Sequence, residues 1–102
     1  MHLIQLLLPL FDNEGNRLDH AAFDEVQAEL TERFGGVTAY LRSPARGAWK
    51  EDGGEVARDE IVIFEVMADP LDREWWHGYR ERLERRFRQE ELVVRALGAE
   101  RL

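Results

Sequence analysis

The stretch Asp59-Glu60-Ile61-Val62-Ile63-Phe64-Glu65-Val66-Met67-Ala68-Asp69-Pro70 decides the fold of this chain. Residues 59–67 alternate between two sets with a period of two, which predicts a strand whose two faces have different neighbours. The Asp69-Pro70 pair predicts a helix start, because proline needs no N–H at the first helical position and aspartate caps free N–H groups. The stretch therefore predicts a strand followed at once by a helix.

The flanking sequence supplies four further elements. Asp52-Gly53-Gly54 is a hairpin signal within residues 49–58, and it joins the central strand to an earlier alternating segment, residues 37–43. Asp19 suits a helix N-cap, with Leu18 and Phe23 as a hydrophobic staple, and Gly35-Gly36 ends that helix. Residues 2–8 and 92–97 are the first and last strands. The order β-α-β-β-α-β predicts an α+β protein, a single domain over residues 1–102.

Such an order implies a four-stranded antiparallel sheet with both helices on one face. One parity set of strand residues is wholly apolar and belongs under the helices, where the helix stripes complete the core. The other set, here called the open face, mixes apolar and polar residues: Leu3, Gln5, Leu7, Thr38, Tyr40, Arg42, Ile61, Ile63, Glu65, Val93, Arg95 and Leu97. Its apolar members would expose on the order of several hundred Å², so we expect a homodimer that covers this face.

Composition limits the classes of function. The net charge of -7 repels phosphate backbones and anionic lipids, so neither a nucleic-acid nor a membrane partner is expected. The third strand also lacks the stacking aromatics of RNA-recognition domains. The chain has no cysteine, which fits a reducing compartment. The apolar run at residues 3–11 has no preceding Lys or Arg and is too short to span a membrane, so we expect a soluble cytoplasmic protein.

Glu65, Arg95 and Gln5 form the first candidate site. With the first strand between the third and fourth, these three side chains become neighbours on the open face. A carboxylate among apolar residues suits a general base, and an arginine suits an anionic ligand. The alternative is an interface ion pair bridged by Gln5.

A second candidate group surrounds the predicted hairpin. Tyr40, Arg42 and Trp49 combine aromatic rings with a guanidinium group, which suits a carboxylate or a planar ligand. Glu60 is a further candidate general base. The alternative is that Trp49 packs across the hairpin while the arginines pair with nearby acids.

No cofactor and no metal site are expected. His2, His20 and His77 have no ligand spacing such as i, i+4 on a helix. The arginine-rich residues 80–88 contain the i, i+4 pairs Glu81–Arg85 and Glu84–Arg88, which is typical of a solvated helix face.

Three local signatures resemble those of a family of small uncharacterised bacterial domains, over roughly residues 8–94. They are Phe34-Gly35-Gly36-Val37-Thr38 with Gly47-Ala48-Trp49-Lys50, then Arg58-Asp59-Glu60 before an aliphatic strand, and Tyr79 with Arg86-Phe87-Arg88-Gln89. The resemblance implies a ferredoxin-like α+β fold and brings no established activity. The architecture is also loosely similar to dimeric α/β-barrel proteins, which include cofactor-free enzymes and ligand-binding modules.

Three hypotheses of function follow. The first is a small-molecule-binding homodimer for a small anionic or aromatic compound, contacted by Gln5, Tyr40, Arg42, Trp49 and Arg95. The second is a cofactor-independent enzyme acting on an acidic small molecule, with Glu65 or Glu60 as general base. The third is a purely structural module that binds a partner.

Overall fold

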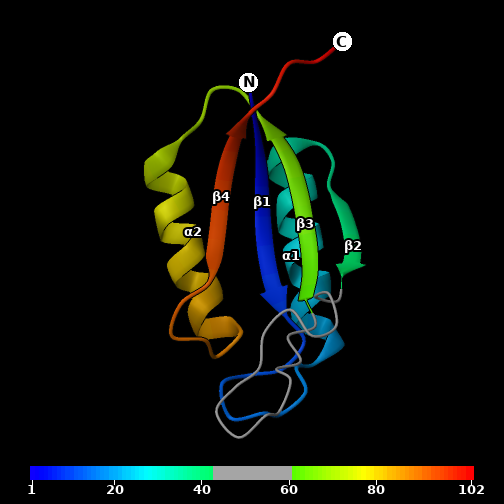
Figure 1. The fold of residues 1–102 in the computed structure, drawn as a ribbon, viewed down its shortest axis with the longest axis vertical. Helices are drawn as coiled ribbons and strands as arrows, with labels where there is room; N and C mark the ends of the chain where they lie inside the picture. Colours follow the sequence, from blue (N-terminus) through cyan, green and yellow to red (C-terminus); the bar gives the residue numbers. More distant parts are fainter. Residues whose placement is uncertain (43–60) are drawn as a thin grey trace, which may run out of the picture.

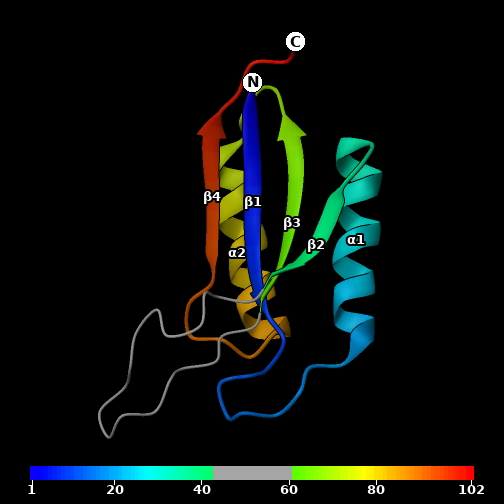
Figure 2. The ribbon, with the colours of Figure 1, turned by 45° about the vertical axis from the view of Figure 1, so that its right-hand side comes forward.

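A computed structural model of the chain describes residues 1–42, without the side chains of 40–42, and residues 61–102. The elements in order are β1 (His2–Pro9), α1 (His20–Phe34), β2 (Thr38–Arg42), β3 (Ile61–Ala68), α2 (Arg73–Arg86) and β4 (Val93–Gly98). The strands form one antiparallel sheet in the order β2-β3-β1-β4. Both helices lie on the same side of this sheet (Figures 1 and 2). The predicted fold class is confirmed, and so is the position of the first strand between the third and fourth.

Helix α1 begins and ends as its sequence predicts. The Asp19 carboxylate accepts a hydrogen bond from the N–H of Ala21 at 3.1 Å, which makes Asp19 the N-cap. Gly35 has a φ of 82°, a left-handed conformation that glycine adopts without steric cost. Its N–H donates to the Thr31 carbonyl at 2.8 Å and so satisfies one of the last free carbonyls of the helix.

Helix α2 begins later than predicted, at Arg73 instead of Pro70. Asp72 is its N-cap, with a carboxylate that accepts from the N–H of Trp75 at 3.1 Å. Asp69 and Asp72 both have the chemistry of an N-cap. Leu71 lies between the two aspartates and packs against the core, and the helix begins after it with Asp72 as its N-cap.

The core lies between the sheet and the two helices. Helix-facing strand residues and the stripes of both helices meet there, and their fully buried members include Ile4, Leu6, Leu8, Val26, Leu30, Phe64, Val66, Tyr79, Leu83 and Phe87. The parity prediction for this face is confirmed on β1 and β3. It is less accurate on β4, where Ala96 is exposed and Val94 only partly buried, because β4 is an edge strand.

Among the open-face side chains that the structure describes, Ile63 differs from its prediction. Ile63 belongs to this face by parity and lies beside Leu7 of β1 and Tyr40 of β2, yet only 1% of it is exposed. Ile63 is therefore already covered within one chain. The apolar surface that this face exposes lies instead toward β4 and the end of β3, where Val93, Leu97 and Met67 are 49%, 45% and 41% exposed.

Candidate functional site

The open face carries a row of three hydrogen-bonded polar side chains, called here the polar row: Arg95, Gln5 and Glu65. The strand register places Gln5 directly between Arg95 on β4 and Glu65 on β3. The Gln5 amide nitrogen donates to the Glu65 carboxylate at 2.6 Å, and Arg95 Nε donates to the Gln5 amide oxygen at 2.7 Å. The sequence-based prediction that these three residues are neighbours is confirmed.

Apolar rows lie on both sides of the polar row. The same register aligns Leu97, Leu3 and Met67 on one side, and Val93, Leu7 and Ile63 on the other. Gln5 and Glu65 are half-buried between these rows, while Arg95 is exposed on the edge strand. The row contains one carboxylate and one guanidinium group, so their formal charges cancel. A partner surface can therefore cover the polar row without burying net charge.

The polar row leaves part of Arg95 for a ligand. Its Nε is held by Gln5, and no hydrogen bond among the described residues involves its two Nη groups. A guanidinium fixed at one nitrogen presents the others in a set geometry, which suits a carboxylate or another planar anion. The chemistry of this arrangement is therefore compatible with an acidic molecule.

The second predicted group is not brought to Arg95 within one chain. Tyr40 and Arg42 lie on β2, beside Ile63 and Ile61 of β3. Because β2 and β4 are opposite edges of the sheet, their backbones are separated by three strand spacings, about 14 Å. Trp49, Glu60 and the predicted hairpin at residues 49–58 lie outside the described residues.

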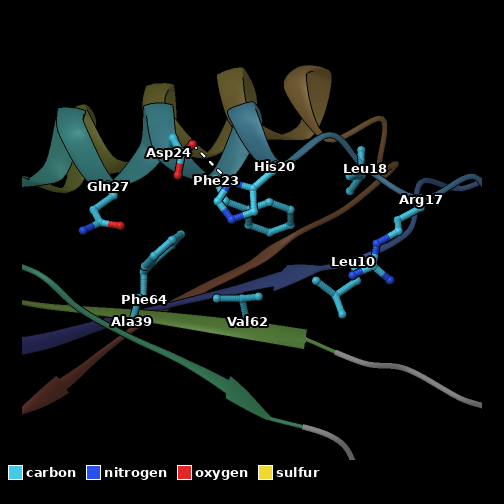
Figure 3. A pocket seen from close by; sticks show the side chains of 10 residues that line it. All are labelled: Leu10, Arg17, Leu18, His20, Phe23, Asp24, Gln27, Ala39, Val62 and Phe64. Atoms are coloured by element: carbon cyan, nitrogen blue, oxygen red, sulfur yellow. Dashed lines mark hydrogen bonds and ion pairs between the residues drawn. The ribbon is translucent and has the colours of Figure 1, made fainter.

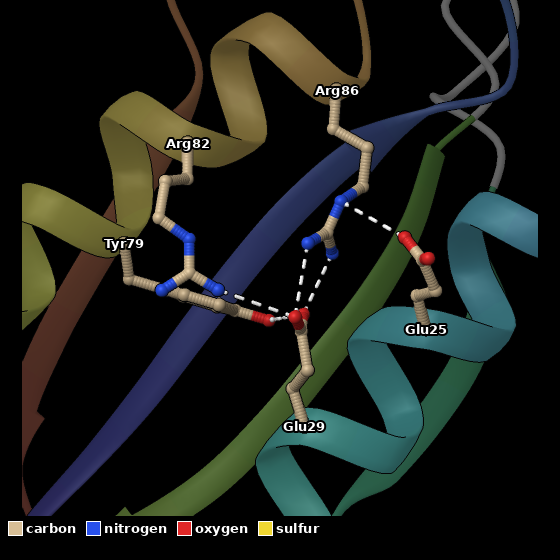
Figure 4. Close-up of polar contacts among 5 residues, drawn as sticks. All are labelled: Glu25, Glu29, Tyr79, Arg82 and Arg86. Carbon is tan, nitrogen blue, oxygen red and sulfur yellow. Dashed lines mark hydrogen bonds and ion pairs between the residues drawn. The ribbon is translucent and has the colours of Figure 1, made fainter.

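A charged cluster between the helices was missed by sequence reasoning. Figure 4 shows Glu25 and Glu29 on α1 facing Tyr79, Arg82 and Arg86 on α2. Arg86 donates to both Glu29 oxygens at 2.7 and 3.0 Å, and its Nε lies 3.2 Å from the Glu25 carboxylate. The Tyr79 hydroxyl donates to Glu29 at 2.9 Å, and Arg82 donates to the same carboxylate at 3.2 Å.

The electrostatics of this cluster favour a structural role. The hydrogen bond from Arg86 holds the pKa of the Glu29 carboxyl below its ordinary value, and the hydroxyl of Tyr79 acts in the same direction. Burial and the Glu29 carboxylate raise the pKa of the Tyr79 phenol. Both shifts move these groups away from neutral pH, whereas an acid or base catalyst needs a pKa near the working pH. The cluster is best described as a brace between the helices.

The brace corrects the prediction that residues 80–88 form a solvated helix face. The Arg86 side chain is only 20% exposed. Glu84 accepts from the N–H of Leu92 at 3.0 Å, and Arg88 lies 3.8 Å from Asp12 instead of pairing with Glu84. One signal was present in the sequence: acids four residues apart on α1 match arginines four residues apart on α2. Such a match has meaning only once the two helices are known to pack side by side.

The histidines do not converge. His2 is on β1, His77 is on α2, and His20 lies 3.1 Å from Asp24 in an exposed pair on α1. Within residues 1–42 and 61–102, no three histidine, aspartate or glutamate side chains gather as a group able to hold a metal ion. Neither described helix has the length and apolar character needed to cross a membrane.

The sheet order and the helices on one side define the ferredoxin-like α+β class. No family model and no curated protein matches the chain. Among solved structures it is similar to a point mutant of CutA1 from Pyrococcus horikoshii OT3, at 12% identity and a TM-score of 0.57, covering 100% of this chain and 86% of that one. It is also similar to CutA from Pyrococcus horikoshii in guanidine hydrochloride, at 12% identity and a TM-score of 0.58, covering 100% and 87%. At this identity the likeness shows the fold alone.

Proposed function

We propose that this protein binds a small anionic or aromatic compound and works as a homodimer through the open face. The observation that carries the proposal is the polar row, a neutral hydrogen-bonded set between two apolar rows. A two-fold dimer needs a surface that is complementary to itself, and a neutral polar centre with apolar flanks has that property.

Exposed apolar side chains supply the driving force for association. Val93 and Leu97 are each about half exposed, so covering each contributes roughly half of the about 1.5–3 kcal/mol that full burial of such a side chain provides. A subunit charge of -7 opposes association. The polar row is formally neutral, so it adds no net charge to the centre of the interface.

A dimer of this kind also brings the predicted ligand contacts of β2 close to those of β4. Two sheets related by a two-fold axis parallel to their strands place β2 of one copy over β4 of the other, because the rotation exchanges the two edges. Tyr40 and Arg42 of the partner subunit then approach the edge that carries Arg95. The ligand site in this proposal lies between the subunits, with Gln5 and Arg95 from one copy; Trp49 remains a further candidate contact.

A thermal-shift titration with aromatic carboxylates tests ligand binding. A ligand that binds only the folded protein raises the melting temperature as its concentration increases. We expect Arg95→Gln to reduce a shift produced by benzoate or phenylacetate, because the charge-assisted pair with the carboxylate is lost. Arg85→Gln, an exposed arginine on α2, is the matched control and should retain the shift. An unchanged shift in Arg95→Gln would exclude the polar row as the site.

The alternative function is a cofactor-independent enzyme acting on an acidic small molecule. Glu65 would be the general base and Arg95 would stabilise developing negative charge, which the polar row permits because the carboxylate is already oriented by Gln5. Glu65→Gln would then abolish turnover while the fold is preserved. Retained turnover in this variant would eliminate Glu65 as the base. Glu60 is the other candidate base.

We propose a single domain over residues 1–102, related to small uncharacterised bacterial domains and located in the cytoplasm, as the absence of cysteine favours. The net negative charge argues against a nucleic-acid partner. A dimer that binds none of the carboxylates tested would favour the purely structural module.

A further inference from the structure

A second feature, on the helix side of the sheet, is a cleft between α1 and the β2–β3 edge. Its volume is about 260 Å³. In Figure 3, Val62 and Phe64 of β3 form its floor, Ala39 lies beside them on β2, and α1 passes above. The cleft is separated from the open face by the thickness of the sheet, so it is independent of the site proposed above.

The sequence explains why this space is open. His20, Asp24 and Gln27 have i, i+4 and i+7 spacing, so they share the side of α1 that lines the cleft. Below them, among the side chains of β2 that the structure describes, Ala39 lines the cleft with a single methyl group. Polar side chains above a single methyl group do not fill the space that two facing leucines would fill.

The inner wall of the cleft is apolar and one end is cationic. Phe23 and Leu18 complete the wall. Figure 3 shows Arg17 at the end nearest Leu18 and Leu10, with His20 reaching down from α1. The His20 ring is paired with Asp24 at 3.1 Å.

Arg17 has no such partner. Its guanidinium carbon lies 5.8 Å from the centroid of the Phe11 ring, and in the part of the chain that the structure describes no carboxylate is within ion-pair distance of it. Arg17 therefore presents a positive charge at one end of the apolar slot, while the Asp24 carboxylate lies on the α1 side and is paired with His20.

We propose that this cleft binds a small carboxylate with an apolar body. The body, a single ring or a short alkyl chain, packs on Val62 and Phe64, and the carboxylate pairs with Arg17. The volume supports this size of ligand, because it is slightly below the range of about 300–1,000 Å³ occupied by sites for drug-sized molecules. The cation selects for the acid over its neutral analogues.

Nuclear magnetic resonance titration with phenylacetate, and with phenylacetamide as its neutral analogue, tests the proposal. In the wild-type protein, phenylacetate should give saturable shifts at the amides of Phe23, Ala39 and Val62. Arg17→Gln should lower the affinity for phenylacetate by about tenfold or more, as expected for loss of a charge-assisted contact, and should leave the affinity for phenylacetamide unchanged.

Two alanine substitutions provide a matched pair of controls. Ala39→Leu fills the cleft and should abolish binding of both compounds, whereas Ala96→Leu makes the same change on the other edge strand, β4, and should leave both affinities unchanged. The proposal is overturned if wild type shows no saturable shift, or if folded Ala39→Leu binds as wild type. It is also overturned if Arg17→Gln leaves the phenylacetate shifts at the amides of Phe23, Ala39 and Val62 unchanged. Shifts that are lost in Arg95→Gln and lie elsewhere report binding at the polar row instead.

Discussion

Glu29 is the point at which the two helices are tied together. It accepts hydrogen bonds from Tyr79, Arg82 and Arg86, all on α2. Its side chain is 33% exposed, whereas that of Glu25, which contacts Arg86 alone in this cluster, is 65% exposed. These two acids on one helix therefore offer a comparison between a well-connected and a weakly connected carboxylate.

We expect Glu29→Gln to lower the free energy of unfolding by about 1–2 kcal/mol at pH 7, because charge-assisted hydrogen bonds are weakened in a partly solvated site. The pKa of Glu29 is lower in the folded state than in the unfolded chain. Its stabilising effect is thus present above the ordinary glutamate pKa and is lost as pH falls through the folded-state pKa. Urea unfolding at pH 7 and at pH 3 measures this difference.

Glu25→Gln is the control for that experiment and should cost less than about 1 kcal/mol. Equal losses in the two variants at pH 7, or a Glu29→Gln loss that persists undiminished in acid, would show that the brace does not act through the Glu29 charge.

At the scale of single elements, the start of α2 distinguishes two aspartates with the same chemistry. Asp72→Ala should lower the free energy of unfolding by about 1 kcal/mol, because the first turn loses its N-cap. Asp69→Ala should have a smaller effect, since Asp69 lies before the helix. Chemical denaturation of both variants measures the difference. A larger loss of stability in Asp69→Ala than in Asp72→Ala would instead support the helix start that the sequence predicts at Pro70.

The elements themselves follow from local patterns, and their errors have local causes. Alternation identified all four strands, and Asp19 with Gly35 fixed both ends of α1. The start of α2 was wrong because capping chemistry alone does not choose between Asp69 and Asp72. The brace was missed because its ion pairs join two different helices. The i, i+4 spacing identifies ion pairs only within a single helix.

At the scale of the whole molecule, strand order decides how much of the site was predictable. The central position of β1 brings Gln5 between Glu65 and Arg95, so that group was predicted correctly. The same strand order places β2, with Tyr40 and Arg42, at the edge of the sheet opposite to β4 and Arg95. Alternation along a strand assigns each side chain to a face of the sheet, but it does not show whether other parts of the chain bury that side chain. The burial of Ile63 was therefore not predicted.

The burial of Ile63 also determines which substitution tests dimerisation. A charge at Ile63 would disturb the folding of one chain as well as any interface, since the residue is buried in the subunit. Leu97 is the better position, because it is exposed and lies next to the polar row on β4. Ala96→Lys, one residue away and on the helix side of the same strand, is the matched control.

Sedimentation equilibrium of wild type, Leu97→Lys and Ala96→Lys is the most direct test of association through the open face. Wild type and Ala96→Lys should have twice the 11.9 kDa subunit mass, and Leu97→Lys should have the mass of one subunit with an unchanged far-ultraviolet circular dichroism spectrum. A wild-type monomer at about 100 μM, a concentration at which most chains of a micromolar dimer are associated, would contradict the account, as would a dimer that survives Leu97→Lys.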